Sequence, residues 1–259
     1  MLQVSNAEYY YGDKSGGGFT GIDFTLQRGE IFCILGPNGC GKTTLLKCLA
    51  GIFPLDNGTI ALSDQTTTAT GIGAMSKFIG YVPQQHQPIF PFSVFDVVLA
   101  GRAPHLQVWQ SPGAADREIA EVAIESLGIA HLQNKLYTHI SGGERQLVIF
   151  ARALAQQPKL LLLDEPASHL DFGNQIRVLH LIDKLAADGM PIIMTTHFPN
   201  HAFSVATRVA LMKHGRFLET GTSEQVVTEA NMEKVYGVKV RVLDIESMDN
   251  RKICVPLYI

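Results

Sequence analysis

The chain has 259 residues, of which 46% are hydrophobic and 17% are charged, and its formal net charge is −3 at pH 7. This composition suits one large or two modest globular domains, and it lacks the basic surplus expected of a nucleic-acid-binding protein. No apolar run approaches the roughly 20 residues that span a bilayer, so we expect no transmembrane segment. The N-terminal MLQVSNAEYYYGD lacks the basic and apolar regions of a signal peptide, so we expect no signal peptide.

The first predicted elements are a strand and a helix joined by a glycine-rich loop. Residues 30–36 (EIFCILG) are apolar and end in glycine, which is typical of a buried strand, and residues 42–52 (KTTLLKCLAGI) follow as a helix. The intervening GPNGCGKTT (36–44) matches the phosphate-binding pattern G-x-x-x-x-G-K-[ST] in the strand–loop–helix context that this motif requires.

Each residue type in this loop has a physical reason to be there. The glycines allow a tight turn whose backbone N–H groups face phosphate oxygens, Lys42 adds a positive charge, and the Thr43 hydroxyl can ligate Mg²⁺. A glycine-rich turn with a chance lysine is the alternative, which the flanking strand and helix disfavour. The candidate nucleotide-binding residues of the loop are Gly36, Pro37, Asn38, Gly39, Cys40, Gly41, Lys42, Thr43 and Thr44.

The four cysteines form no C-x-x-C pair, and three of them fall in one strand–loop–helix stretch. This distribution suits reduced thiols in a cytosolic protein better than a disulfide framework. Cys40 lies at the predicted helix N-terminus, where we expect a lowered thiol pKa and a modifiable thiol, although a loop-filling side chain without a further role is the preferred interpretation. The four are Cys33, Cys40, Cys48 and Cys254.

The middle of the chain is predicted to be mostly helical. Residues 93–102 (SVFDVVLAGR) and 116–129 (DREIAEVAIESLGI) have helical patterns and are separated by a Pro/Gly-rich loop. We interpret residues of about 86–155 as a helical subdomain inserted into an α/β body. The second helix is expected to bury one apolar face, formed by Ile119, Val122, Ala123 and Leu127.

Within this middle part, residues 139–146 (HISGGERQ) place a serine and two glycines directly before an apolar helical pattern. The backbone N–H groups at such a helix start are suited to holding an anion. The stretch therefore predicts a second phosphate-binding turn in the same chain.

Two further buried strands follow the helical part. Residues 160–166 (LLLLDEP) are limited to strand length by the prolines around them, and residues 191–197 (PIIMTTH) form a second apolar run. Residues 176–189 (IRVLHLIDKLAADG) lie between them as a helix. Buried strands that alternate with helices predict an α/β fold with a parallel sheet.

Both strands end in side chains that can take part in chemistry. Asp164 at a strand tip can hold Mg²⁺, and Glu165 can polarise an attacking water. His197 ends the next strand, where its imidazole can contact a γ-phosphate or the attacking water. Each side chain alone could be solvated or structural, but the phosphate loop in the same chain favours the catalytic interpretation.

The C-terminal stretch VKVRVLDIESMDNRKICVPLYI (238–259) alternates apolar and polar residues around the turn-like SMDN, which predicts a hairpin. We therefore divide the chain into a main domain of residues 1–235 and a β appendage of residues 236–259.

Taken together, these motifs resemble those of the nucleotide-binding subunits of ATP-binding cassette (ABC) transporters. The phosphate loop resembles Walker A, LLLLDE (160–165) resembles Walker B with its adjoining glutamate, and ISGGE (140–144) resembles the L-S-G-G-Q signature. The resemblance covers about residues 1–225, in the order and spacing of the family.

Four further positions match the family one by one, and the resemblance implies a role for each. Tyr11 in YYYGD matches the aromatic residue that stacks on adenine, and it is preferred over the two tyrosines before it. Gln84 in IGYVPQQ matches the Q-loop glutamine that joins the body to the helical subdomain. Asp171 in SHLD matches the D-loop residue that links the two sites of a dimer, and His197 matches the switch histidine that senses the γ-phosphate.

The signature departs from the family pattern at two positions. Ile140 replaces leucine and Glu144 replaces glutamine, whereas Ser141 and Gly143, which resemble the phosphate donors, are retained. Glu165 is present as the implied general base, so the resemblance indicates a hydrolysing site.

The resemblance implies a P-loop NTPase α/β core, with a mainly parallel sheet, an N-terminal antiparallel β part and the inserted helical subdomain. It implies ATP and Mg²⁺ as cofactors, with Thr43, Gln84 and Asp164 facing the metal. It also implies a head-to-tail homodimer in which each signature completes the ATP site of the other chain. The signature residues concerned are Ser141, Gly142, Gly143 and Glu144.

Within the family, residues 90–106 (FPFSVFDVVLAGRAPHL) and 195–202 (TTHFPNHA) resemble ATPases of importers for metal chelates. This implies uptake of an iron-siderophore, haem, cobalamin or molybdate through a separate transmembrane permease, fed by a substrate-binding protein. The chain would lie at the cytoplasmic face of the inner membrane. A coupling helix of the permease would dock in a groove lined by residues of about 84–105.

Other classes of ABC ATPase are the alternatives. An exporter subunit is often fused to membrane helices, a DNA-repair member carries long coiled coils, and a ribosome-acting member usually carries two cassettes. The sequence shows none of these features, which favours import without identifying the substrate.

Overall fold

The computed structural model describes residues 1–12, 17–62, 65–67, 77–84, 90–168, 170–245 and 251–257. Its central element is a six-stranded sheet with the strand order β10-β9-β3-β8-β7-β6, in which β9 and β10 pair antiparallel and all other neighbours are parallel. The strands are β3 (Ile31–Leu35), β6 (Ile79–Val82), β7 (Leu160–Leu163), β8 (Ile192–Thr196), β9 (Arg208–Lys213) and β10 (Arg216–Gly221). The three strands predicted from apolar runs, namely β3, β7 and β8, are confirmed.

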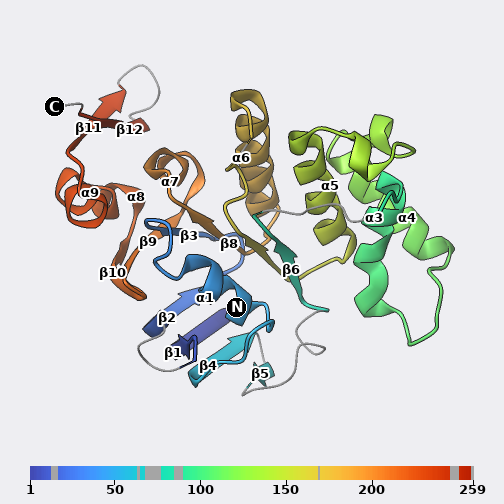
Figure 1. The fold of residues 1–259 in the computed structure, drawn as a ribbon, viewed down its shortest axis with the longest axis horizontal. Helices are drawn as coiled ribbons and strands as arrows, with labels where there is room; N and C mark the ends of the chain where they lie inside the picture. The colour runs from blue at the N-terminus through green and yellow to red at the C-terminus, as the bar shows by residue number, and fades with distance from the viewer. Residues whose placement is uncertain are drawn as a thin grey trace.

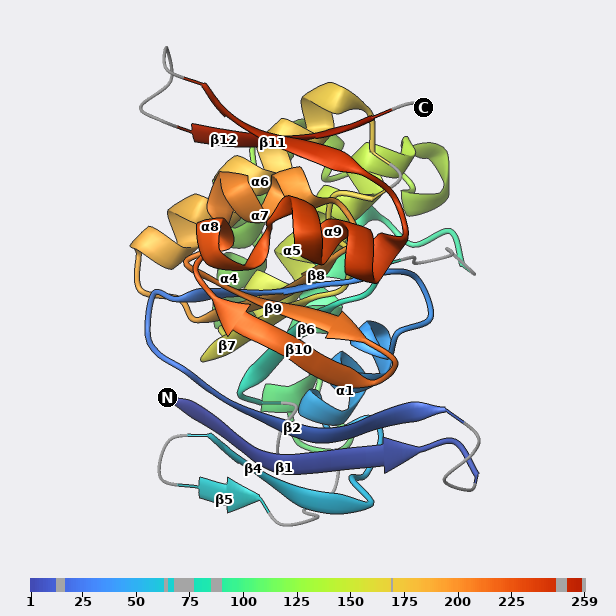
Figure 2. The ribbon, with the colours of Figure 1, turned by 90° about the vertical axis from the view of Figure 1, so that its left-hand side faces the viewer.

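A second, antiparallel sheet has the strand order β2-β1-β4-β5 and forms the N-terminal part of the fold. Helix α1 lies between the two sheets, as Figures 1 and 2 show. The elements are β1 (Leu2–Tyr10), β2 (Gly18–Leu26), β4 (Asn57–Leu62), β5 (Gln65–Thr67) and α1 (Lys42–Leu49).

The central sheet is buried on both faces because its side chains alternate between two cores. In β3, Phe32 and Ile34 pack with α1 and the antiparallel sheet, whereas Ile31, Cys33 and Leu35 pack on the opposite side, where α5, α6 and α7 cover the sheet (Figure 1). These helices are α5 (Gly142–Ala155), α6 (Phe172–Ala187) and α7 (Pro199–Val205). None of the helices in the described ranges has both the length and the apolarity to cross a bilayer.

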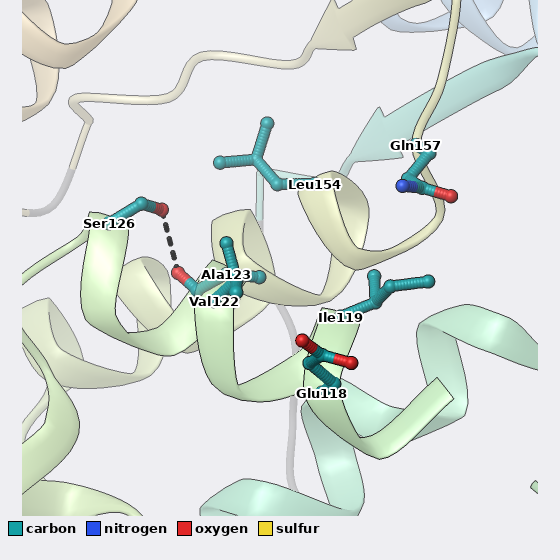
Figure 3. A pocket seen from close by; sticks show the side chains of 7 residues that line it. All are labelled: Glu118, Ile119, Val122, Ala123, Ser126, Leu154 and Gln157. Carbon is teal, nitrogen blue, oxygen red and sulfur yellow. Dashed lines mark hydrogen bonds between the residues drawn. The ribbon is translucent and has the colours of Figure 1, made fainter. Parts of the chain in front are cut away.

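The middle of the chain forms the expected helices, but one predicted face is wrong in part. Helix α4 buries Ala120, Ala123 and Ile124, whereas Val122 is 59% exposed. Val122 instead lines a surface pocket beside Leu154 of α5 (Figure 3). Both stripes are apolar, and the stripe that meets α3 and α5 is the one that is buried. The elements are α3 (Val94–Leu99), η1 (Ala100–His105), α4 (Ala114–Ser126), η2 (Ala130–Leu132) and η3 (Tyr137–His139).

The C-terminal hairpin is confirmed, with β11 (Val240–Ile245) paired antiparallel to β12 (Arg251–Pro256). It follows α8 (Ser223–Val226) and α9 (Glu229–Tyr236) and lies on the far side of the helical layer from the central sheet (Figure 2). The predicted turn lies outside the described residues, as does the start of the predicted helical subdomain. The domain division itself stays a prediction.

Candidate nucleotide-binding site

The phosphate loop connects β3 to α1 and is held in shape by its own lysine. Gly39 and Gly41 adopt left-handed backbone angles, with φ of 77° and 108°, which side chains with a Cβ rarely tolerate. The Lys42 ammonium donates to the carbonyl oxygens of Gly36 at 2.7 Å and Pro37 at 3.0 Å. The loop is therefore closed, and Lys42 is almost fully buried.

Thr43 and Asp164 meet at the base of the loop, as a site for Mg²⁺ requires. The Thr43 hydroxyl donates to Asp164 Oδ1 at 3.0 Å, and the Thr195 hydroxyl donates to the same oxygen at 2.8 Å. Burial raises the pKa of Asp164, although these hydrogen bonds oppose the rise. Hydroxyl and carboxylate oxygens are hard ligands of the kind that Mg²⁺ prefers, so this pair fits the ion.

Glu165 is the point where the predicted catalytic side chains converge. Its carboxylate lies 3.5 Å from the Lys42 ammonium, accepts from Gln84 Nε2 at 3.1 Å and lies 2.8 Å from His197 Nδ1. It is only 6% exposed, and its backbone adopts a left-handed φ of 47°. A strained non-glycine residue of this kind persists only where its surroundings hold it, and such residues cluster at functional sites.

Thr195 belongs to the candidate site, and the sequence analysis missed it. Its hydroxyl accepts the Glu165 N–H at 2.9 Å while donating to Asp164 Oδ1, so one side chain of β8 holds the carboxylate of Asp164 and the main chain of Glu165, the two residues that follow β7. The available signal was a polar side chain inside an otherwise apolar buried strand.

Tyr11 lies at the mouth of the loop. Its hydroxyl is 3.0 Å from Thr44 Oγ1, and its ring meets the Tyr9 ring edge-on with a centroid distance of 5.1 Å. Tyr9 in turn stacks on Phe53 at 5.4 Å. Tyr11 is 46% exposed, so its ring is available to a ligand. Tyr9 packs against the Tyr11 ring.

These residues enclose a pocket of about 440 Å³. Five of the predicted ATP-binding and catalytic residues lie outside its lining, namely Gly36, Pro37, Cys40, Asp164 and His197. The lining residues are Tyr11, Gly17, Gly18, Asn38, Gly39, Gly41, Lys42, Thr43, Thr44, Gln84 and Glu165.

The expected lowering of the Cys40 pKa is wrong. Cys40 is only 6% exposed, and burial raises the pKa of its thiol, with the Lys42 charge and backbone hydrogen bonds opposing that rise only in part. All four cysteines are free and buried, as expected for reduced thiols.

The second glycine turn is built as a capped helix start. Ser141 is the N-cap of α5: its Oγ accepts the Glu144 N–H at 3.3 Å, and the Glu144 carboxylate accepts the Ser141 N–H at 2.7 Å. These hydrogen bonds lower the pKa of Glu144. The glutamate therefore closes a capping box, for which the S-x-x-E pattern was the sequence signal. Ser141 and Gly142 are exposed.

The structure separates this turn from the pocket that contains Lys42. None of residues 141–144 belongs to the lining of that pocket. Asp171 is the N-cap of α6 and accepts both the N–H and the side-chain amide of Asn174, at 2.9 and 2.8 Å. A Cβ added to Gly143 would meet Asn174, so the signature turn and the start of α6 are close neighbours.

Comparison with known proteins identifies the family. The model of the ABC transporter family matches residues 19–168. The hemin import ATP-binding protein HmuV of Hahella chejuensis is 38% identical over 229 residues, which cover 86% of this chain and 88% of that protein. The molybdate import ATP-binding protein MolC of Haemophilus influenzae is 36% identical over 236 residues, which cover 91% and 87% of the two chains.

A solved structure gives the same result for the fold. It shows the inward-facing conformation of an ABC transporter assigned to the metal-chelate type, with 35% identity, a TM-score of 0.87, and coverage of 99% of this chain and 97% of that one. These likenesses confirm the family resemblance and the fold class inferred from the sequence. The chain belongs to the ABC transporter family.

Proposed function

We propose that this chain is the ATP-binding and ATP-hydrolysing subunit of an ABC importer for a metal-chelate-type substrate such as an iron-siderophore, haem, cobalamin or molybdate. The observation that carries the proposal is the convergence of Lys42, Gln84 and His197 on the buried Glu165 carboxylate. Relatives named as hemin and molybdate import ATP-binding proteins support the transport class.

ATP binding would use the loop and the pocket as they are built. Loop N–H groups and Lys42 bind the phosphates, and Lys42 exchanges its present carbonyl partners for phosphate oxygens. The Tyr11 ring stacks on the adenine. Thr43, Gln84 and Asp164 would hold Mg²⁺, and the charge of the ion would offset the negative charge of the phosphates.

Hydrolysis would use Glu165 as the general base. Glu165 takes a proton from the attacking water, the water oxygen bonds to the γ-phosphorus, and the bond from that phosphorus to the ADP oxygen breaks. His197, 2.8 Å from Glu165, orients the carboxylate and contacts the γ-phosphate. The Gln84 amide donates a hydrogen bond to Glu165 Oε2, the same oxygen atom that His197 contacts. This bond links the general base to the Q-loop.

A homodimer would complete each site. Ser141 and Gly142 are exposed at a helix start and do not line the pocket of their own chain, which supports their contact with ATP bound to a second copy. Gly143 and Glu144 follow them in the same turn. Asp171 caps the neighbouring helix and would connect the two sites across the dimer.

The permease would dock on a groove between the body and the helical part. This groove of about 290 Å³ is lined by β6, η1, α5 and the segment that follows α1, and of the expected range 84–105 it contains only Pro104 among the described residues. Residues 85–89 lie outside the described part. The lining residues are Ala50, Ile52, Ile79, Tyr81, Pro83, Pro104, Ile149, Arg152, Ala153 and Gln156.

Docking there would place the chain on the cytoplasmic face of the membrane, with a substrate-binding protein acting from the other side. Co-purification with the permease, followed by ATPase assays in liposomes, tests this function. We expect Mg²⁺-dependent hydrolysis that rises when a substrate-loaded binding protein is added. Absence of hydrolysis in the assembled complex would contradict the proposal.

A further inference from the structure

The C-terminal hairpin is joined to helix α7 through the side chain of Asn200. Asn200 Nδ2 donates to the carbonyl oxygen of Cys254 at 3.2 Å, and the Cys254 N–H donates to Asn200 Oδ1 at 2.8 Å. One side-chain amide thus pairs with both main-chain groups of one residue in β12, as a neighbouring strand would.

The register of the hairpin explains why this pairing is available. Cys254 lies opposite Val242, and the N–H groups of both residues point away from the partner strand. The Val242 N–H donates to the Glu229 carboxylate of α9 at 3.3 Å. Asn200 and Glu229 therefore satisfy the two outer edges of the hairpin from two different helices, and unpaired edges of this kind need such cover.

Asn200 follows the proposed catalytic histidine, His197, along the chain, at the start of α7. The Phe198 ring lies 4.0 Å from the His197 ring and 5.1 Å from the His201 ring, measured between centroids. The Thr196 hydroxyl accepts the Phe198 N–H at 3.0 Å and lies 3.2 Å from His201 Nδ1. These contacts tie the start of α7 to the end of β8, so a displacement of α7 is passed to His197.

We propose that Asn200 is a positioning residue through which the C-terminal hairpin holds α7, and thereby His197, in the geometry that hydrolysis requires. The inference rests on the proposed function of His197. On this account the hairpin is a functional part of the ATPase, because loss of the Asn200–Cys254 pairing releases α7, the helix that follows His197.

The test is Asn200→Ala in the full-length chain. We expect kcat for ATP hydrolysis to fall at least about threefold while KM for ATP stays within about twofold, because Asn200 does not line the nucleotide pocket. The imidazole NMR signals of His197, assigned with His197→Gln, should shift or broaden. Asn200→Asp keeps the acceptor for the Cys254 N–H and should recover part of the lost kcat.

Two matched controls separate coupling from general damage. Ser204→Ala removes a hydroxyl that bonds the Asn200 carbonyl within α7, and Glu229→Ala releases the other edge of the hairpin. Both should keep kcat and the His197 signals close to wild type. If Asn200→Ala does not fold, kcat and the His197 signals of Asn200→Asp test the proposal in its place.

Unchanged kcat and unchanged His197 signals in the Asn200 variants would overturn the proposal, as would equal effects from Ser204→Ala. A wild-type chain that does not hydrolyse ATP would contradict the proposed function instead. In that case the His197 signals still test the link between the hairpin and α7.

Discussion

The chain contains two glycine-containing helix starts that are both suited to binding anions. They differ in burial and in their contacts with the rest of the chain. The loop before α1 is closed, with Lys42 buried and bonded to loop carbonyls. The turn before α5 is exposed and held by the capping box of Ser141 and Glu144. The first turn lies among its partners within the chain, whereas the second is exposed at Ser141 and Gly142.

The two turns have similar local chemistry but different surroundings. Both turns present backbone N–H groups at a positive helix end. The first turn combines the buried Lys42 and the Thr43 hydroxyl with two carboxylates that follow β7, those of Asp164 and Glu165. The second therefore fits the proposed role of completing a site on another copy, and the predictions below test this contrast.

The largest effect is expected for the base. Glu165→Gln should keep ATP binding but slow hydrolysis at least about a hundredfold, because an amide cannot accept the proton from water. Steady-state phosphate release and nucleotide binding would be measured together. Turnover near wild type would remove Glu165 from the role of general base.

The exposed turn is tested by Ser141→Arg. The bulky cation should abolish ATP-driven dimerisation while the single chain still binds ATP, because the variant leaves the pocket around Lys42 intact. Size-exclusion chromatography with light scattering, with and without ATP, measures this. Dimer formation equal to wild type would argue against the composite site.

A smaller effect is expected at the pocket mouth. Tyr11→Ala should raise the Kd for ATP about fivefold, since aromatic stacking contributes on the order of 1 kcal/mol. Tyr11→Phe keeps the ring and loses only the hydroxyl contact with Thr44, so it serves as the control. A Kd that does not change in Tyr11→Ala would move the adenine contact elsewhere.

The smallest effect concerns the capping box. Glu144→Ala should lower the free energy of unfolding by about 0.5–1 kcal/mol because the Ser141 N–H loses its acceptor. Glu144→Gln keeps an acceptor oxygen and should stay close to wild type. Chemical denaturation of the three proteins makes the comparison, and equal losses in both variants would show that the charge, not the cap, matters.

Much of the nucleotide pocket could be predicted because local pattern and tertiary structure agree there. The apolar run before the loop must be a strand, and its buried neighbours end at the same edge of the sheet, which brings Asp164, Glu165 and His197 to the loop. Chain order and strand ends therefore predicted these residues, whereas Tyr11 and Gln84 were inferred from the family resemblance.

Two expectations failed where burial decides between local alternatives. Helix α4 has two apolar stripes, and only packing against α3 and α5 selects Ala120 and Ile124 over Val122. For Cys40, the helix end favours the thiolate, but burial opposes it more strongly. The links made by Thr195 and Asn200 join segments far apart in the chain, so no local pattern indicates which residues they bond.

The central claim is that the phosphate loop of one chain and the turn before α5 of a second chain form one ATP site together. The direct test is ATP hydrolysis by an equal mixture of Lys42→Ala and Ser141→Arg chains, each inactive alone. A head-to-tail dimer of the two restores one site, with the pocket from Ser141→Arg and the signature from Lys42→Ala. This dimer can form because its arginine faces only the pocket that lacks Lys42 and therefore does not meet bound ATP. We predict hydrolysis well above that of either variant by itself, and a mixture no more active than its components would contradict the claim.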